Sequence, residues 1–213
     1  MATDISAQHG IRHEARHESR VDVKLDRRAA ILAAAREVLA EKGLEAAKIS
    51  DIVARAGVAQ GTFYLYFPSK LSLVLALAED MNTGLLASVQ RVFESTPNLS
   101  EAIQAAVVAA FRELEQFKDV LGILHSRMGI VDFYAECKKL DEPSHEFVAA
   151  MIRAAQAAGQ MTPTVNPTIS AQLIVGLLEH AAHACFVLDV QQPTDAYIAE
   201  VVRFIRDGLG VAA

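Results

Sequence analysis

The chain contains 213 residues, of which 52% are apolar and 6% aromatic, and its formal net charge is −6 at pH 7. Its longest apolar runs are much shorter than a bilayer span and residues 1–28 are polar and charged, so we expect neither a membrane segment nor a secretory signal. The absence of Trp favours packed helices. The two cysteines, Cys137 and Cys185, are far apart, which predicts reduced thiols in a soluble, cytoplasmic protein.

The N-terminal segment, residues 1–25, is charged, has almost no apolar face and is expected to be flexible. It contains HEARH, in which His13, Glu14 and His17 have the spacing of a zinc-protease helix. A zinc site of that kind needs a buried helix and a further ligand, whereas this segment is solvated. We therefore predict no metal site there.

Helical periodicity begins near Asp26 and continues to Gly43, where a helix is expected to stop. One apolar face is formed by Ile31, Leu32, Ala35, Val38 and Leu39. A second, short helix with its own apolar face is expected to end at Gly57. A turn and a very short helix follow, up to the break at Pro68-Ser69. Helices joined by a tight, glycine-containing turn predict a helix-turn-helix.

The rest of the chain reads as a series of longer helices. Ser69 can cap a helix that runs to Ser95, and Ser100-Glu101 opens the next one, after the break at residues 96–98. Residues 118–140 are less regular and predict one or two shorter helices, and Pro143 suits the first turn of another. Two apolar helices, over residues 168–189 and 194–210, complete the chain. No strand pattern is present, so we predict an all-α fold of about nine helices.

Residues 43–70, GLEAAKISDIVARAGVAQGTFYLYFPSK, resemble the DNA-binding signature of the TetR family of transcriptional regulators. The matching positions are Gly43, Ile52, Val53, Ala56-Gly57-Val58, Gly61-Thr62-Phe63-Tyr64 and Phe67-Pro68-Ser69-Lys70. The resemblance covers roughly residues 26–75 and rests on helix number and layout beyond them. It implies a helix-turn-helix DNA-binding domain at residues 26–70 and a ligand-binding and dimerisation domain at 71–213. The charge fits this division, because residues 1–70 carry 11 basic and 9 acidic side chains and residues 71–213 carry 9 and 17.

The resemblance implies a ligand-responsive regulator without cofactor or catalytic activity. Such a protein binds a palindromic operator in double-stranded DNA as a homodimer and, as a repressor, is released by a small apolar or amphipathic effector. Ligand binding changes the spacing of the two DNA-reading heads. A transcriptional activator of the same family is the alternative.

A recognition helix must present small or polar groups to enter the major groove, and Gln60, Gly61 and Thr62 meet that demand. Tyr64 and Tyr66 can donate to phosphates, Leu65 can meet a thymine methyl group, and Lys70 can pair with a phosphate. Phe63 and Phe67 are expected to face inward. The predicted DNA-binding residues are Arg28, Lys48, Gln60, Gly61, Thr62, Tyr64, Leu65, Tyr66 and Lys70. An arm could also follow the phosphates through Arg12, Arg16 and Arg20.

Three positions depart from the usual pattern of the family, one of which is Tyr66 in place of a common His. Lys48 stands where a Ser or Thr often caps the second helix, and a lysine side chain cannot accept the capping hydrogen bond. Ala59 likewise replaces a frequent Ser or Thr before the recognition helix. These changes leave the expected function intact but put the operator sequence beyond inference.

For the C-terminal part we predict one set of residues for the effector pocket and one for the dimer interface. The pocket candidates combine apolar bulk with polar tips: Phe111, His125, Met128, Phe133, Tyr134, Phe147, Met151 and His180. The interface candidates form the apolar faces of the last two helices: Leu173, Leu177, Ala181, Val201, Phe204 and Ile205.

Two other classes of function compete with a regulator. A metalloenzyme is hinted at by the pair Glu142 and His145 and by Glu179 with His180 and His183, but each set supplies too few ligands. A helical adaptor for other proteins has no need for the arrangement of Thr62, Tyr64 and Lys70. We therefore favour the regulator.

Overall fold

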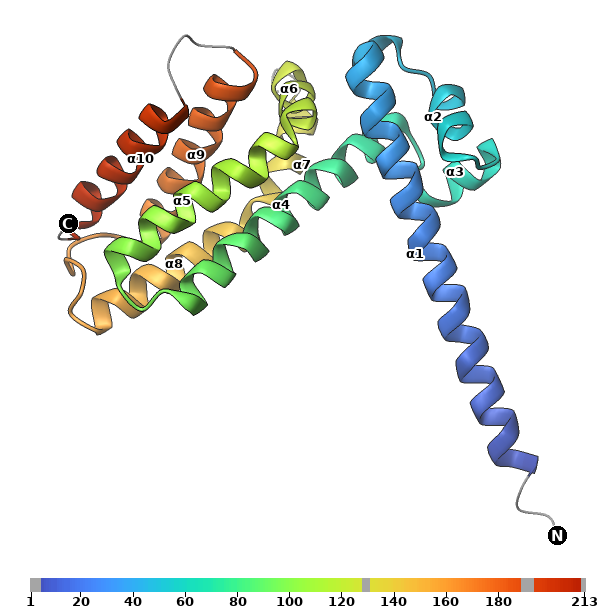
Figure 1. Cartoon of the computed structure of the whole chain (residues 1–213), viewed down its shortest axis with the longest axis horizontal. Coiled ribbons are helices and arrows are strands. Elements are labelled where there is room, and N and C mark those ends of the chain that lie inside the picture. Colours follow the sequence, from blue (N-terminus) through green and yellow to red (C-terminus); the bar gives the residue numbers. More distant parts are fainter. Residues whose placement is uncertain (1–4, 128–130, 189–193, 212–213) are drawn as a thin grey trace. The chain divides into compact units, whose positions relative to one another are not determined.

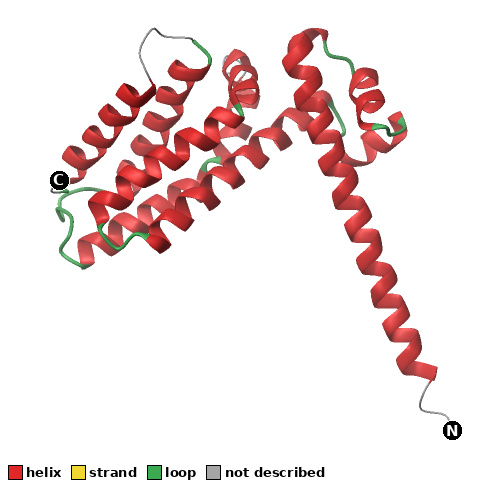
Figure 2. Cartoon of the chain, in the orientation of Figure 1, coloured by secondary structure: helices red, strands yellow, loops and turns green. Residues whose placement is uncertain are grey.

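The computed structural model describes the backbone of residues 5–127, 131–188 and 194–211, and the side chains of residues 26–126, 133, 135–188 and 194–211. Within these ranges there are ten α-helices and no strand, so the all-α prediction is confirmed (Figures 1 and 2). The helices are α1 (Ile5–Ala46), α2 (Ile49–Ala56), α3 (Gln60–Tyr66), α4 (Lys70–Ser95), α5 (Leu99–Gln116), α6 (Lys118–Arg127), α7 (Val131–Leu140), α8 (Glu142–Ala157), α9 (Pro167–Phe186) and α10 (Thr194–Leu209).

The chain divides into two compact units, Met1–Leu73 and Val74–Ala213. In the N-terminal unit α2 packs against both α1 and α3. The apolar face predicted for the first helix is buried, and Ile31, Val38, Ile52 and Phe63 all have exposed fractions of 1% or less. The burial of this face orients α3 with respect to the two preceding helices.

Two details of α1 differ from a simple helix that ends at a glycine. Gly43 has φ 73° and ψ 165°, so regular helical geometry stops there as predicted, and a further turn carries the element on to Ala46. At its other end the backbone is helical from Ile5, where we expect a flexible tail from the sequence. Glu, Arg and Ala residues there have good helix propensity. The side chains of residues 5–25, including HEARH and the arginine repeat, lie outside the described part of the chain.

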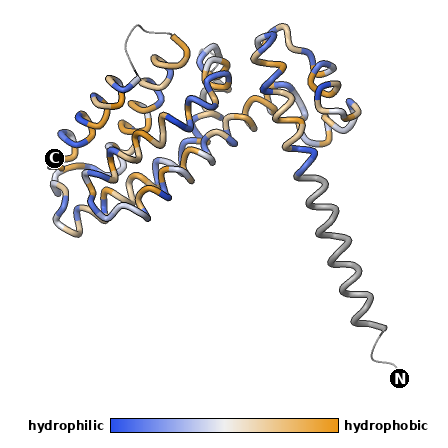
Figure 3. Tube along the Cα trace, viewed as in Figure 1, coloured by the Kyte–Doolittle hydropathy of each residue, from blue (hydrophilic) through white to orange (hydrophobic). Residues whose placement is uncertain are grey.

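In the C-terminal unit α9 packs against α5, α6, α8 and α10, and α5 also packs against α10. Hydrophobic and hydrophilic residues alternate along these helices, as amphipathic packing requires (Figure 3). The core formed by α5, α8, α9 and α10 includes Phe111, Ile152, Val201 and Ile205. Ten helices replace the expected nine because residues 118–140 form two helices, α6 and α7.

Helix α9 is long and apolar enough, by length and composition, to cross a membrane, and the bent pair α3–α4 passes the same test. The core helices of helical bundles share this composition. Because α9 packs against four other helices of its own unit, we interpret it as a core helix.

Candidate functional site

The turn between α2 and α3 is short and closed by backbone hydrogen bonds. Helix α2 ends at Gly57, whose φ of 66° is left-handed, and the amide of Val58 donates to the carbonyl of Val53 at 3.1 Å. Ala59, in an extended conformation, then begins α3, and its carbonyl accepts from the amide of Thr62 at 2.9 Å. A glycine at position 57 is therefore what allows the two helices to be joined by three residues.

Helix α3 is anchored by two aromatic side chains. Phe63 and Phe67 are buried, with exposed fractions of 0% and 2%, which confirms that they face inward. Their ring centroids lie 5.7 Å apart, and the guanidinium carbon of Arg28 lies 5.8 Å from the centroid of the Phe67 ring. Arg28, predicted to bind DNA, is thus half-buried against the base of α3. A seven-residue helix is held in place by these contacts rather than by its own length.

The opposite face of α3 is open. Gln60 and Gly61 are exposed, Tyr64 and Leu65 are 48% and 80% exposed, and Thr62 and Tyr66 are half-buried. A methyl group at Gly61 would meet no described atom within 4 Å, so the backbone there is accessible. Leu65 is the most exposed of the large apolar side chains in the described part of the chain. All the predicted base- and phosphate-reading residues of α3 are therefore at least partly accessible.

Lys48, also predicted to contact DNA, is exposed at the start of α2. Its backbone amide donates to Oδ2 of Asp51 at 3.1 Å, which is half of a capping box. The ammonium of Lys42 lies 2.9 Å from the same carboxylate. These two donors lower the pKa of Asp51, Lys42 contributing first. The Lys48 side chain takes no part in the cap, as we expect for a group that has no acceptor.

Lys70 has a structural role that the sequence does not predict. Its Nζ donates to the backbone carbonyls of Leu44 and, at 3.0 Å, Ala47, at the end of α1. Two of its three N–H donors are therefore used inside the fold. Arg55 has a related role, because its guanidinium is 2.7 Å from Glu37 and 2.9 Å from Glu41 on α1. The spacing of Glu37 and Glu41 on one helical face was the available signal for this contact.

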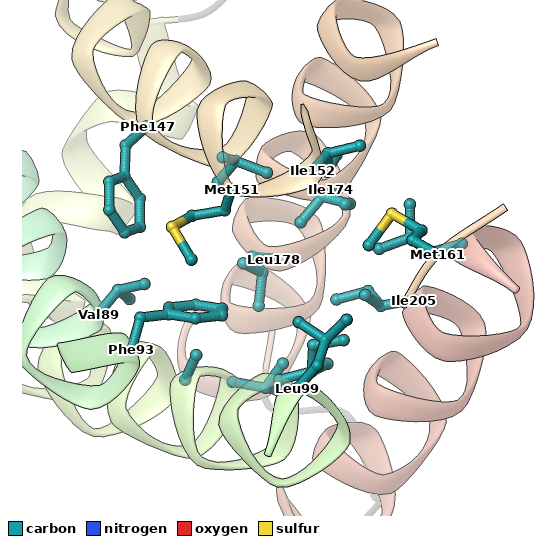
Figure 4. Close-up of a pocket in the computed structure, with 15 residues that line it drawn as sticks. Val89, Phe93, Leu99, Phe147, Met151, Ile152, Met161, Ile174, Leu178 and Ile205 are labelled. Atoms are coloured by element: carbon teal, nitrogen blue, oxygen red, sulfur yellow. The ribbon is translucent and has the colours of Figure 1, made fainter. Parts of the chain in front are cut away.

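The C-terminal unit contains an apolar cavity of about 80 Å³, shown in Figure 4. Two of the predicted pocket residues, Phe147 and Met151 on α8, line it. Every other lining side chain is also apolar: Val89, Phe93, Leu99, Ile103, Ala106, Val107, Val148, Ile152, Met161, Ile174, Leu178, Ile205 and Leu209. This set is called the apolar cavity below. It suits a hydrocarbon group and offers no polar side chain to fix a head group.

A second, larger cavity of about 330 Å³ lies between α4, α6, α7 and α9. It includes two other predicted pocket residues, His125 and His180. We call it the polar cavity, after its hydrogen-bonding side chains: Asn82, His125, Cys137, Lys138, Asp141, Glu179, His180 and His183. The structure thus divides the predicted pocket residues between two cavities, and this one combines apolar side chains such as Leu121 and Leu124 with polar groups.

The other pocket candidates with described side chains, Phe111 and Phe133, line neither of these two cavities. Phe111 and Phe133 are each 1% exposed and belong to the interior, where Phe111 packs edge-on against Phe186. Met128 and the side chain of Tyr134 lie outside the described residues. Bulky aromatics are the residues most often used to fill a helical core, which is why size alone did not identify cavity residues.

Comparison with known proteins gives the family. Residues 31–77 match the family model described as "Bacterial regulatory proteins, tetR family". Residues 103–209 match that of the "Tetracyclin repressor-like, C-terminal domain". The chain belongs to the TetR family. It is a helix-turn-helix, DNA-binding transcriptional regulator with a ligand-binding domain, and not an enzyme.

Relatives of this TetR-family protein agree in sequence and in fold. The uncharacterised HTH-type transcriptional regulator YvdT of Bacillus subtilis is 32% identical over 183 residues, which cover 85% of this chain and 94% of YvdT. The structure of FadR from Bacillus subtilis in complex with stearoyl-CoA has a TM-score of 0.73 at 19% identity and covers 84% of this chain and 98% of that one. FadR from Thermus thermophilus in complex with lauroyl-CoA has a TM-score of 0.68 at 18% identity, over 87% and 96% of the two chains. At these identities the two structures show the fold alone.

The residues that the sequence assigns to a TetR-family dimer interface fall into two groups. Leu173 and Phe204 are 68% and 58% exposed, and Leu177 is half-buried beside them along the groove between α9 and α10. Ala181, Val201 and Ile205 are 3–6% exposed and pack in the core of the subunit. Because these three side chains are already buried in their own subunit, they are not available to a second one.

No group of three His, Cys, Asp or Glu side chains within the described ranges is placed to hold a metal ion. Three features of the TetR-family regulator are used below: the open face of α3, the apolar and polar cavities, and the exposed apolar face of α9 and α10.

Proposed function

We propose that this TetR-family regulator reads a palindromic operator as a homodimer through the open face of α3, and acts as a repressor. The observation that supports this is that buried aromatic side chains fix one side of α3 to the N-terminal unit, while the rest of the helix is accessible. Phe63 and Phe67 fix the helix, while Gln60, Gly61 and Tyr64 stay available for base edges and phosphates. In this proposal residues 26–70 read DNA and residues 71–213 bind the effector and form the dimer, in the cytoplasm.

The effector we propose is a small amphipathic molecule with a hydrocarbon part. Two structural neighbours are described as complexes with stearoyl-CoA and lauroyl-CoA, and the apolar cavity of this chain suits such a tail. Its 80 Å³ is about half the volume of an engineered cavity that holds benzene. A tail of several methylene groups therefore enters only if the lining helices move apart.

That enlargement supplies a route for regulation. Val89 and Phe93 of α4 line the apolar cavity, and the same continuous helix begins at Lys70 in the N-terminal unit. A ligand that binds better when α4 is displaced shifts the population toward that arrangement. We propose that the displaced arrangement no longer matches two half-sites one helical turn apart.

The dimer is proposed to form through α9 and α10. Leu173 and Phe204 expose apolar surface on adjacent helices, and antiparallel pairing of two such helix pairs across a two-fold axis would cover it. A single-chain repressor would leave this surface in water at a cost of about 25 cal/mol per Å².

A mobility-shift titration on the DNA upstream of the protein's own gene tests the proposal. We expect a retarded complex that unrelated DNA of equal length does not form. Gln60→Ala and Thr62→Ala should each weaken it about a hundredfold, because a homodimer loses the contact in both subunits and one base or phosphate contact typically provides about 1–3 kcal/mol. Gln160→Ala, at an exposed position beyond α8, is the matched control. The proposal would be overturned if the parent protein bound both DNAs with equal affinity, or if the two α3 variants and the Gln160→Ala control bound the upstream DNA equally well. Transcription in vitro from the same DNA separates a repressor from an activator.

A further inference from the structure

The polar cavity contains more charge than the proposed hydrocarbon effector needs. Asp141 is 6% exposed, and its carboxylate accepts from Nδ2 of Asn82 at 3.2 Å and from Nζ of Lys138 at 2.8 Å. Glu179, on α9, lies 3.5 Å from the same lysine nitrogen. Two carboxylates thus share one ammonium group, so among the described side chains that line the cavity one negative charge is in excess when Glu179 is ionised and the histidines are neutral.

The raised pKa of Glu179 agrees with the presence of only one described ammonium group beside the two carboxylates. Burial, and then the negative charge of Asp141, raise the pKa of Glu179 to about 7, although Lys138 acts in the opposite direction. The described charged or titratable groups that line the cavity come from all sides. They are His125 of α6, Cys137 and Lys138 of α7, Asp141 before α8, and Glu179, His180 and His183 of α9. A second positive charge beside the carboxylates would stabilise the ionised form of Glu179.

An independent observation is the side chain of His183. It lines the polar cavity, is 7% exposed and stacks on His125 with ring centroids 3.6 Å apart. Its Nε2 is buried and has no hydrogen-bond partner among the described residues. Burial, then the charges of His125 and His180, lower the pKa of His183, which favours the neutral ring, and in the tautomer protonated on Nδ1 the Nε2 atom is an acceptor. A buried acceptor without a donor is costly and points to a missing ligand.

We propose that the polar cavity is a binding site for a small organic cation, namely a protonated amine with an apolar body. The acceptors match the three N–H donors of a primary ammonium, since Asp141, Glu179 and His183 line the same cavity. Leu85, Leu121 and Leu124 provide an apolar wall for the body of the ligand. An anionic ligand would meet two carboxylates, whose nearest cation, Lys138, is already paired with both.

The volume is also suitable. A cavity of about 330 Å³ is roughly twice the size of one that holds benzene, so a ligand of about a dozen non-hydrogen atoms fits. No residue lines both cavities, and the amine site requires neither the hydrocarbon effector nor the operator. Its test therefore stands apart from that of the proposed function.

Three probes that share one body separate the head-group chemistry: 4-phenylbutylamine, 4-phenylbutan-1-ol and 4-phenylbutanoate. They are titrated calorimetrically into the full chain at pH 8, where the amine is protonated and Glu179 is mostly ionised. We expect the amine to bind at least about tenfold more tightly than the alcohol, because charge-assisted hydrogen bonds are the stronger ones, and the carboxylate not to bind.

The matched variants are Glu179→Gln and Glu136→Gln, because Glu136 is an exposed carboxylate on α7 that pairs with Lys139 outside the cavity. Glu179→Gln should weaken amine binding about tenfold and leave alcohol binding unchanged, whereas Glu136→Gln should alter neither. Asp141→Asn provides a second variant, used only if its circular dichroism matches that of the parent. Equal binding of the three probes, tightest binding of the carboxylate, or equal behaviour of the two glutamate variants would overturn the proposal.

Discussion

Among single residues, Lys70 shows most clearly how one side chain stabilises the DNA-binding unit. Its ammonium group connects the start of α4 to the carbonyls of Leu44 and Ala47, which follow the glycine where α1 stops being regular. Leu44 lies in the last turn of α1 and Ala47 directly follows that helix, where carbonyls have no partner from a next helical turn. The lysine closes the turn by supplying the missing donors.

We predict that Lys70→Ala destabilises the protein. Two half-buried carbonyls lose their donor, which costs about 1–3 kcal/mol in the free energy of unfolding. Urea unfolding followed by circular dichroism measures this loss. Lys48→Ala, which removes a lysine whose exposed side chain takes no part in the cap of α2, should leave the midpoint unchanged. An unchanged midpoint for Lys70→Ala would show that the lysine is available for phosphate alone.

Single residues also mark the limit of what the sequence can predict here. Phe63 and Phe67 were predictable as inward-facing because apolar side chains in a short amphipathic helix have only one side to pack on. The partners of Lys70 were not, since a long cationic side chain reaches carbonyls far away in sequence. Residue type identifies a cation but does not say which anion or carbonyl it will meet.

At the scale of elements, the helix boundaries follow from local chemistry. Ser69 accepts from the amide of Ser72 at 3.0 Å, so the predicted cap of α4 is confirmed. Asn98 and Asn166 cap α5 and α9 through their side-chain oxygens. Helix α5 therefore begins at Leu99, one residue before the predicted Ser100. Caps and glycines act within a few residues, which is why they can be recognised without the fold.

What the sequence could not decide was the environment of each helix face. Helix α9 is apolar on more than one side, so periodicity does not distinguish Leu173, which is exposed, from Ala181, which is buried. The same ambiguity placed Val201 and Ile205 at the dimer interface rather than in the core. The separation of an apolar from a polar cavity depends on how several helices pack together, and no single helix contains that information.

Helix α3 offers a prediction that separates folding from DNA binding. Gly61 lies inside the helix with open space around it, so Gly61→Ala should raise the free energy of unfolding by about 1 kcal/mol. The added methyl group should at the same time weaken operator binding, because the backbone can no longer approach the DNA as closely. Urea unfolding and a mobility shift measure the two effects.

Gly57→Ala is the matched comparison, since Gly57 has a left-handed φ of 66°. We expect it to lower the free energy of unfolding by about 1 kcal/mol or more. If the Gly61→Ala variant were more stable than the parent and still bound the operator with full affinity, the N-terminal end of α3 would not be the surface that contacts DNA.

For the whole molecule, the exposed apolar face of α9 and α10 is the feature that a second subunit would cover. We predict that Leu173→Glu, which puts a charge at the most exposed apolar position of α9, raises the dissociation constant of the dimer at least about tenfold. Sedimentation velocity measures the change, and circular dichroism should show an intact fold because Leu173 lies outside the core.

Arg153→Glu, at an exposed position on α8, is the control and should leave the assembly unchanged. A parent protein that sediments as a monomer at micromolar concentration, or a Leu173→Glu variant that remains dimeric, would contradict the proposed interface. The same variant should bind the operator weakly, because one recognition helix contacts only a single half-site.

The central claim is that two copies of α3 read successive major grooves, and hydroxyl-radical footprinting of the upstream DNA tests it most directly. We predict two protected patches on one face of the duplex, about 10 base pairs or a multiple of that apart and related by a two-fold axis. Both patches should disappear with Gln60→Ala at a protein concentration that protects fully with the parent chain. A single patch, no protection, or protection that Gln60→Ala leaves unchanged would contradict the account.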